Sequence, residues 1–201
     1  MGGSVRGPGR LAEPPGAASP YTRPEGEGIK ASIQERMLRA AKLDVELYEE
    51  VEADRDATVQ AMTVVVLAAV AAGIGSLGSG SVSSIVTGTL LALVSWLVWA
   101  FLTYFIGTRL LPEPQTSADY GELLRTIGFA SAPGVIRVFG IIPGVGFLFF
   151  LAAGIWMLVA MVIAVRQALD YTSTPRAVGV CLIGWLVQVV IIILAAPLLG
   201  F

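Results

Sequence analysis

Hydrophobic residues fill long uninterrupted runs over the last three quarters of the chain. Four of these runs are long enough to cross a bilayer as helices, since a span needs about 20 apolar residues at ~1.5 Å per residue. They cover residues 57–74, 84–106, 145–165 and 177–199. The pattern therefore predicts an all-α integral membrane protein, with residues 57–201 as its membrane domain.

A fifth apolar run, residues 120–139, is interrupted by Arg125, Pro133 and Arg137. Whether this run crosses is decided by the cations around it, because Lys and Arg concentrate on the cytoplasmic side of a membrane. If it crosses, only Arg137 lies opposite the rest. The cations that then share one side are the eight before residue 57 and Arg109, Arg125, Arg166 and Arg176. This predicts a five-helix bundle with a cytoplasmic N-terminus and the C-terminus outside.

Small residues occupy the middle of this third span. Gly128, Ser131, Ala132, Pro133 and Gly134 leave little side chain on the helix surface. Helices in lipid associate through close packing of such residues, and a proline interrupts the helical ladder. We expect these five residues to form the packing hub of the bundle, with a kink at Pro133.

The polar residues of the spans predict packing rather than transport. Arg125 and Arg137 should extend toward opposite interfaces, because an arginine at mid-depth costs about 2.5 kcal/mol or more. Gln188 lies deep in the last span, where an interhelical hydrogen bond is the simpler role. Pumps and ion-coupled carriers need ionisable groups at that depth, and the interior of the spans has no Asp, Glu, Lys or His.

The polar N-terminal quarter divides into two parts. Residues 1–28 are rich in Gly, Pro, Ala and Ser and predict a disordered cytoplasmic tail. Residues 29–56 predict juxtamembrane helices, the first of which starts after a capping box at Ser32. Its polar face carries Arg36, Arg39 and Lys42, which suits contact with an anionic leaflet. The alternative is a surface helix packed on the protein's own bundle.

The second of these helices is acidic. Seven acidic residues fall between Asp44 and Asp56, and Asp44 is placed to cap the helix. Tyr48 belongs to a narrow apolar stripe, with Glu49 and Glu50 beside it. Such a run is either a solvated surface or a docking site for a basic partner. A protein partner at this helix and the lipid bilayer are the two partners expected.

Composition argues against several classes of function. The 201 residues include no His and a single cysteine, Cys181, in an apolar run. We therefore expect no catalytic residues of the Ser-His or Cys-His type, no metal site and no cofactor. The net charge of −2 and the absence of a basic patch argue against a nucleic-acid partner.

Three stretches resemble the bacterial branch of the Yip1-domain family. They are LDVELYEEVEADRDATVQA (residues 43–61), RTIGFASAPGVIRV (residues 125–138) and VAMVIAVRQALDYTS (residues 159–173). The resemblance implies a five-helix membrane domain with a cytoplasmic N-terminus. The eukaryotic branch is associated with Rab-type GTPases through an acidic D-L-Y-G-P motif. Asp44 and Tyr48 match that motif, whereas Glu49 and Glu50 replace its Gly and Pro.

These observations predict a non-enzymatic membrane scaffold of the bacterial cytoplasmic membrane. Its cytoplasmic helices would recruit a partner. One alternative is an accessory subunit that docks on a larger membrane complex through the small residues of the third span. Another is a transporter or channel, which requires a polar path through the bundle.

Overall fold

The computed structural model describes residues 31–77 and 82–199. The tail predicted at residues 1–28 lies outside the described residues, as does part of the loop between the first two spans. Within the described part every regular element is helical, and no strand occurs there.

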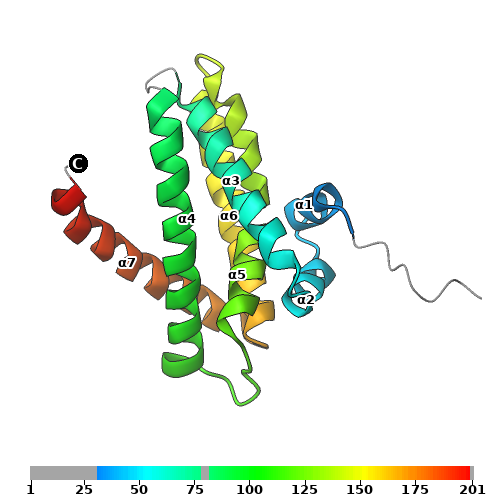
Figure 1. Ribbon diagram of the computed structural model, residues 1–201. Coiled ribbons are helices and arrows are strands. Elements are labelled where there is room, and N and C mark those ends of the chain that lie inside the picture. The colour runs from blue at the N-terminus through cyan, green and yellow to red at the C-terminus, as the bar shows by residue number, and fades with distance from the viewer. Residues whose placement is uncertain (1–30, 78–81, 200–201) are drawn as a thin grey trace, which may run out of the picture. The chain divides into compact units, whose positions relative to one another are not determined.

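The helices follow the chain in the predicted order (Figure 1). Five segments are long and apolar enough to cross a membrane: Ala57–Gly75, Ile85–Leu110, Tyr120–Ile141, Gly146–Ala168 and Thr174–Ile191. The elements are α1 (Ile33–Ala41), α2 (Val45–Ala53), α3 (Ala57–Gly75), α4 (Val82–Phe105), the π-helical turn η1 (Ile106–Leu110), α5 (Tyr120–Phe129), the 3-10 helix η2 (Ala132–Ile141), α6 (Gly146–Ala168) and α7 (Thr174–Leu199). The prediction of an all-α membrane protein with five spans is confirmed.

The two short N-terminal helices begin where the capping residues predict. The Ser32 hydroxyl accepts from the Glu35 amide at 3.2 Å, and the Asp44 carboxylate accepts from the Glu46 amide at 3.1 Å. Between them the chain reverses through Leu43, which has a φ of 62°. The amide of Asp44 then donates to the Arg39 carbonyl at 3.1 Å, as in a Schellman motif.

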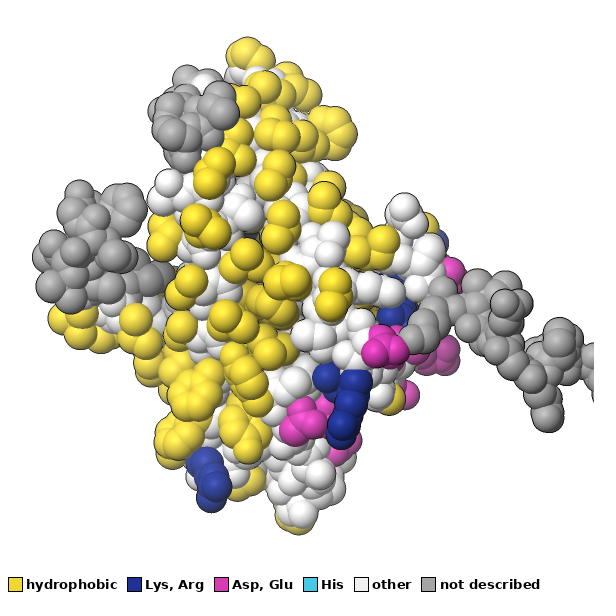
Figure 2. Space-filling view, in the orientation of Figure 1, with side chains coloured by type: hydrophobic (Ala, Val, Ile, Leu, Met, Phe, Trp, Pro, Cys, Tyr) yellow, Lys and Arg dark blue, Asp and Glu magenta, His cyan; other side chains and the backbone are white. Residues whose placement is uncertain are grey.

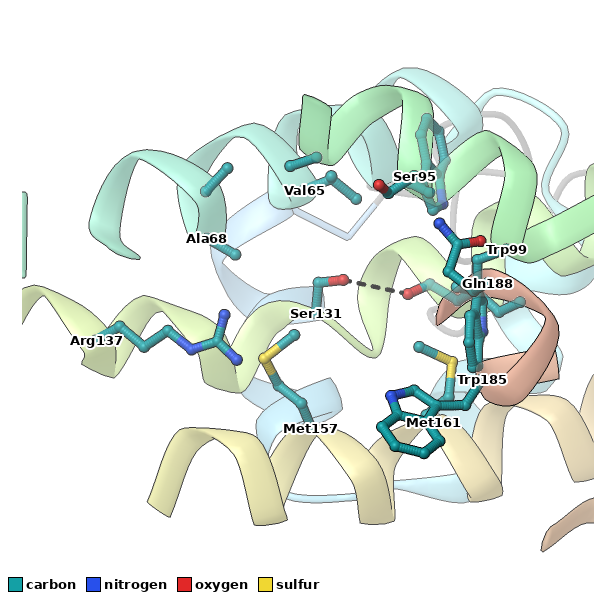
Figure 3. A pocket seen from close by; sticks show the side chains of 14 residues that line it. Val65, Ala68, Ser95, Trp99, Ser131, Arg137, Met157, Met161, Trp185 and Gln188 are labelled. Carbon is teal, nitrogen blue, oxygen red and sulfur yellow. Dashed lines mark hydrogen bonds between the residues drawn. The ribbon is translucent and has the colours of Figure 1, made fainter. Parts of the chain in front are cut away.

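The third span is two helices in series rather than one kinked helix. The α-helix α5 ends at Phe129, and the 3-10 helix η2 follows from Ala132. Pro133 has no amide proton, so the chain continues on i−3 bonds such as Gly134 amide to Ser131 carbonyl, 2.9 Å. The Ser131 hydroxyl donates to the Ile127 carbonyl at 3.5 Å, inside the bundle (Figure 3).

This third span is the most enclosed of the five. Half of the residues in its most apolar window are buried (50%), against 11 to 33% in the other four. Gly128, Ala132, Pro133 and Gly134 are buried, and Ser131 is half-buried. The small residues therefore carry close contacts within the chain itself.

Gly128 shows how close these contacts are. A Cβ atom added there would lie 2.7 Å from the Cβ of Ala61 on α3 and 3.2 Å from the Ala61 backbone. At Gly134 an added Cβ would meet the sulfur of Met157 at 2.9 Å and the Cβ of Ala68 at 3.2 Å. The helices α3 and α6 thus cover the small-residue surface of the third span.

The outer surface is divided between apolar and charged areas. Large hydrophobic side chains are exposed along α4, α6 and α7, and one apolar face is seen in Figure 2. Charged side chains gather at the end of the bundle that carries α1 and α2 (Figure 2). We call this the charged end.

Candidate functional site

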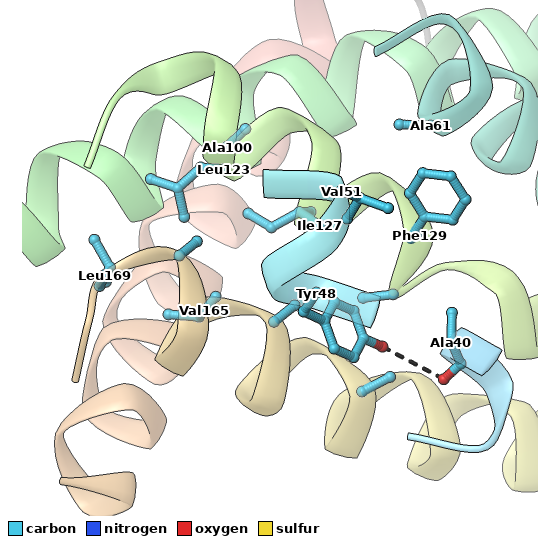
Figure 4. Packing of buried hydrophobic residues seen from close by; sticks show 14 of the residues in the cluster. Ala40, Tyr48, Val51, Ala61, Ala100, Leu123, Ile127, Phe129, Val165 and Leu169 are labelled. Atoms are coloured by element: carbon cyan, nitrogen blue, oxygen red, sulfur yellow. Dashed lines mark hydrogen bonds between the residues drawn. The ribbon is translucent and has the colours of Figure 1, made fainter. Parts of the chain in front are cut away.

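The helices α1 and α2 are packed onto the bundle rather than held in solvent. Leu47, Tyr48 and Val51 of α2 are fully buried, each with 0% exposure. Figure 4 shows Tyr48 and Val51 among hydrophobic side chains of the third span and α6. The Tyr48 hydroxyl donates to the Ala40 carbonyl of α1 at 3.4 Å, and burial raises the pKa of Tyr48. One aromatic residue thereby joins both short helices to the core.

Arg36 is the polar centre of this docked pair. Its side chain is 4% exposed. It donates from Nε to Glu50 at 2.9 Å, from Nη2 to Asp54 at 2.8 Å and from Nη1 to the Gln60 amide oxygen at 3.0 Å. These acceptors lie on α2, just after it and on α3, so Arg36 holds three segments together.

Arg39 extends the same network toward the surface. It donates to Asp44 at 2.7 Å and to the second carboxylate oxygen of Glu50 at 2.5 Å. The hydrogen bond from Arg39 lowers the pKa of Asp44, and Asp44 in turn raises the pKa of Arg39. Glu50 therefore bridges both arginines, one on each of its oxygens.

This network changes how the predicted cationic face can act. Arg36 points inward and is saturated with carboxylate and amide oxygens, so it does not reach the surface that was expected to meet lipid. Arg39 is 27% exposed but paired. Lys42 is exposed. The predicted alternative, a surface helix packed on the bundle, describes the observed α1.

Arg125 of α5 binds the C-terminal end of α2. Its guanidinium, 5% exposed, donates from Nε to the Val51 carbonyl at 2.8 Å and from Nη2 to the Glu52 carbonyl. The last carbonyls of a helix have no partner within the helix and carry partial negative charge, which a cation stabilises. Arg125 therefore caps α2, the helix that immediately precedes the first span.

An acidic cleft lies beside this capped end. It has a volume of about 720 Å³, and its lining includes four carboxylates and one cation. These charged residues are Glu49, Glu52, Glu122, Asp170 and Arg166. Burial, followed by the charges of Glu122 and Asp170, raises the pKa of Glu52 to about 7. The four carboxylates of the cleft therefore outnumber the two nearby cations, Arg166 and Arg125.

The opposite wall of the cleft is fixed by the segment between α6 and α7. The Tyr171 hydroxyl donates to the carbonyls of Gly107 (2.9 Å) and Leu111 (2.6 Å), and burial raises its pKa to about 12. Glu113 accepts from the amides of Thr172 at 3.0 Å and Ser173 at 3.3 Å, which lowers the pKa of Glu113. The cleft is therefore built on rigid supports from both sides.

The structure sorts the predicted site residues into two groups. Arg36, Arg39, Asp44, Tyr48, Glu49 and Glu50 meet at the docked helices, and Lys42 lies at their edge. The hub residues lie in the bundle and contact α3 and α6. Among the described residues, no group of three or more potential ligands could hold a metal ion.

The sequence placed Glu52 in the acidic run but did not identify Arg125 or Glu113 as parts of this region. One signal for Arg125 was available. The last turn of α2 has no basic residue, so its carbonyls need a donor from elsewhere in the chain. The raised pKa of Glu52 depends on carboxylates from α5 and the segment after α6, which only the folded chain brings together.

The bundle and its docked helices define a multi-pass integral membrane protein of five spans. Comparison with known families gives a match to the Yip1 domain over residues 46–196. The chain belongs to the Yip1-domain family. The match includes α2 and all five spans, whereas α1 precedes it. Neither the curated proteins nor the solved structures gave a match.

Proposed function

We propose that this protein is a non-enzymatic membrane scaffold whose charged end recruits a partner with a cationic segment. In this proposal the protein resides in the bacterial cytoplasmic membrane. Its N-terminus and charged end are cytoplasmic, and its C-terminus is outside. The asymmetry of cations that predicts this orientation supports the placement.

The acidic cleft is the observation that carries the proposal. Four carboxylates line it with one cation, and the pKa of Glu52 is raised to about 7. Burial is the main cause of this raised pKa, and the charges of Glu122 and Asp170 add to it. A cationic side chain entering the cleft would offset the repulsion among the carboxylates and favour ionised Glu52. Charge complementarity of this kind guides partner choice and association rate.

Rigid support for the cleft also favours a scaffold. Arg36 and Arg125 tie the C-terminal half of α2 to α1 and α5, and Arg36 also bonds Gln60 of α3. A preformed surface loses less conformational entropy on binding than one that must be ordered. The acidic helix therefore presents its carboxylates in a constant arrangement.

The structure offers no support for an accessory subunit that docks on a larger complex through the small residues of the third span. It needs the small residues of the third span to be free for another protein. Gly128 and Gly134 instead contact Ala61, Ala68 and Met157 of the same chain. The surface intended for an outside helix is already covered.

Crosslinking of the full chain in native membranes, read by mass spectrometry, tests the scaffold. The cleft variant is E49Q with E122Q, which removes two charges while glutamine retains the capping role at Glu122. The control of equal charge is E35Q with E46Q, two exposed residues of α1 and α2 that do not line the cleft. We expect the cleft variant to lose the crosslink to one defined partner and the control to keep it. Equal recovery with both variants would contradict the proposal.

A further inference from the structure

A second cavity lies inside the bundle, apart from the acidic cleft. Its volume is about 330 Å³, within the range of about 300–1,000 Å³ common for ligand sites. Each of the five spans contributes lining residues, all of which lie within the membrane-crossing segments. Three of the four tryptophans of the chain line it, namely Trp96, Trp99 and Trp185.

Among the described residues, three side chains that line this cavity each have one buried polar atom with no hydrogen-bond partner. They are Nε1 of Trp99, Nε of Arg137 and Oε1 of Gln188. Gln188 is only 8% exposed. Buried polar groups are nearly always paired, so three unpaired atoms among the lining residues single out this cavity as a candidate ligand site. This finding also replaces the predicted interhelical hydrogen bond for the Gln188 oxygen.

Figure 3 shows how these groups are arranged. Arg137 enters from one end of the cavity, Gln188 and Trp99 lie at the other, and Ser131 and Met157 lie between them. The Arg137 carbonyl is packed so closely on α3 that a Cβ at Gly75 would lie 2.0 Å from it. Because Gly75 is the last residue of α3, the Arg137 end is the end nearer a membrane interface.

The charge of Arg137 defines the ligand chemistry. An arginine in a membrane interior is costly unless an anion accompanies it. Of the residues that the structure describes, no Asp or Glu lines this cavity. The Arg137 guanidinium faces the cavity (Figure 3).

The surroundings indicate where such an anion comes from. The cavity is open rather than sealed, and Trp185 on its lining is 56% exposed. Because the lining belongs to the spans and Trp185 is exposed on an apolar helix, we infer that the cavity is reached from the bilayer. A lipid can enter by lateral diffusion, whereas a soluble anion would have to cross hydrocarbon.

We propose that this cavity binds an anionic lipid, with its phosphate on Arg137 and its ester or hydroxyl oxygens on Trp99 and Gln188. A glutamine amide can present either its oxygen or its NH2 group to such a ligand. The apolar remainder of the lining, including Met157 and Met161, contacts the first part of an acyl chain. This site is independent of the partner-binding role of the charged end.

Quenching of tryptophan fluorescence by brominated lipids tests the proposal in the full chain. The protein is placed in phosphatidylcholine nanodiscs that contain a small fraction of brominated phosphatidylglycerol or of brominated phosphatidylcholine. Trp156→Phe removes the one tryptophan outside the cavity. We expect the anionic lipid to quench strongly at fractions where the zwitterionic lipid has little effect. Equal quenching by both lipids would overturn the proposal.

Variants and competitors identify the groups involved. Arg137→Gln should weaken the apparent affinity for phosphatidylglycerol about tenfold or more, and Arg137→Lys should retain most of it. Arg109→Gln is the matched control, because Arg109 is exposed and outside the cavity. Oleate should displace phosphatidylglycerol if any anionic headgroup on an acyl chain can bind Arg137. If oleate does not displace it, the site requires a phosphate. Competition by glycerol phosphate, which has no acyl chain, would contradict the proposal that the ligand is a lipid.

Two further variants apply if Arg137→Gln does not fold. Trp99→Phe and Gln188→Leu each remove one of the unpaired groups and leave the charge in place. Each should weaken phosphatidylglycerol binding severalfold, as expected for loss of one hydrogen bond. Unchanged binding in both would overturn the assignment of the cavity.

Discussion

The guanidinium of Arg125 donates to the Val51 carbonyl at 2.8 Å, across 74 positions of sequence. This contact joins the third span to the C-terminal end of α2. It places a buried cation where a helix presents unpaired carbonyls, beside Glu52 of the acidic cleft. The stability of the charged end should therefore depend on this one side chain.

Replacing Arg125 with Met should release the C-terminal end of α2. Two buried carbonyls would lose their donor, at a cost of about 1–3 kcal/mol each. Hydrogen exchange of residues 45–53 should accelerate while exchange in the cores of α4 and α6 is unchanged. Arg109→Met, at an exposed arginine, should leave α2 protected. An unaltered exchange rate in the Arg125 variant would contradict the capping role.

The two arginines of α1 should differ in how strongly they couple to their carboxylates. The Arg36 side chain is 4% exposed against 27% for Arg39, whereas their partners Glu50 and Asp44 are similarly exposed, at 34% and 32%. A double-mutant cycle for Arg36→Met and Glu50→Gln should give a coupling of about 1–3 kcal/mol. The cycle for Arg39→Met and Asp44→Asn should give less than about 1 kcal/mol. Equal couplings would show that burial does not separate the two pairs.

Glu52 should make the protein less stable as the pH rises. Its pKa is raised from 4.5 to about 7 by burial and by Glu122 and Asp170, so the folded state retains a proton that the unfolded chain releases. The stabilisation of the folded state by protonated Glu52 is fully present below pH 4.5 and is lost as the pH rises through about 7. Thermal unfolding of Glu52→Gln should therefore show a flatter pH profile and a higher midpoint than wild type above that value. If wild type and Glu52→Gln show the same dependence of the unfolding midpoint on pH between 4.5 and about 7, the prediction is wrong.

Adding one methyl group at Gly128 should separate two spans. The new Cβ would lie 2.7 Å from the Ala61 Cβ, so Gly128→Ala should destabilise the protein by about 1–3 kcal/mol. The same substitution at Gly88 meets nothing within 4 Å and should be neutral or stabilising by about 0.5–1 kcal/mol. Chemical unfolding in mild detergent measures both. Ala61→Gly should partly rescue Gly128→Ala, and the absence of rescue would place the strain elsewhere.

Much of the fold was predictable because membrane helices are encoded locally. A span needs its own run of apolar residues, and cations need an aqueous side, so run lengths and charge positions predicted five crossings. Ser32 and Asp44 likewise predicted the starts of α1 and α2, because capping involves only neighbouring residues. Pro133 indicated a break in the third span, although the 3-10 helix after it depends on how α3 and α6 pack there.

The roles of the arginines were decided only by the tertiary structure. Alone in the sequence, Arg36, Arg125 and Arg137 are each cations beside or within apolar runs, and extension to an interface is the economical expectation. Arg36 instead meets Glu50 and Asp54, and Arg125 meets the carbonyls of α2. Arg137 faces a cavity to which all five spans contribute. Hydrophobic periodicity acts over a few turns of helix and can be read from the sequence. The partner of a buried charge depends on distant segments, which only the packing of the whole chain brings within hydrogen-bonding distance.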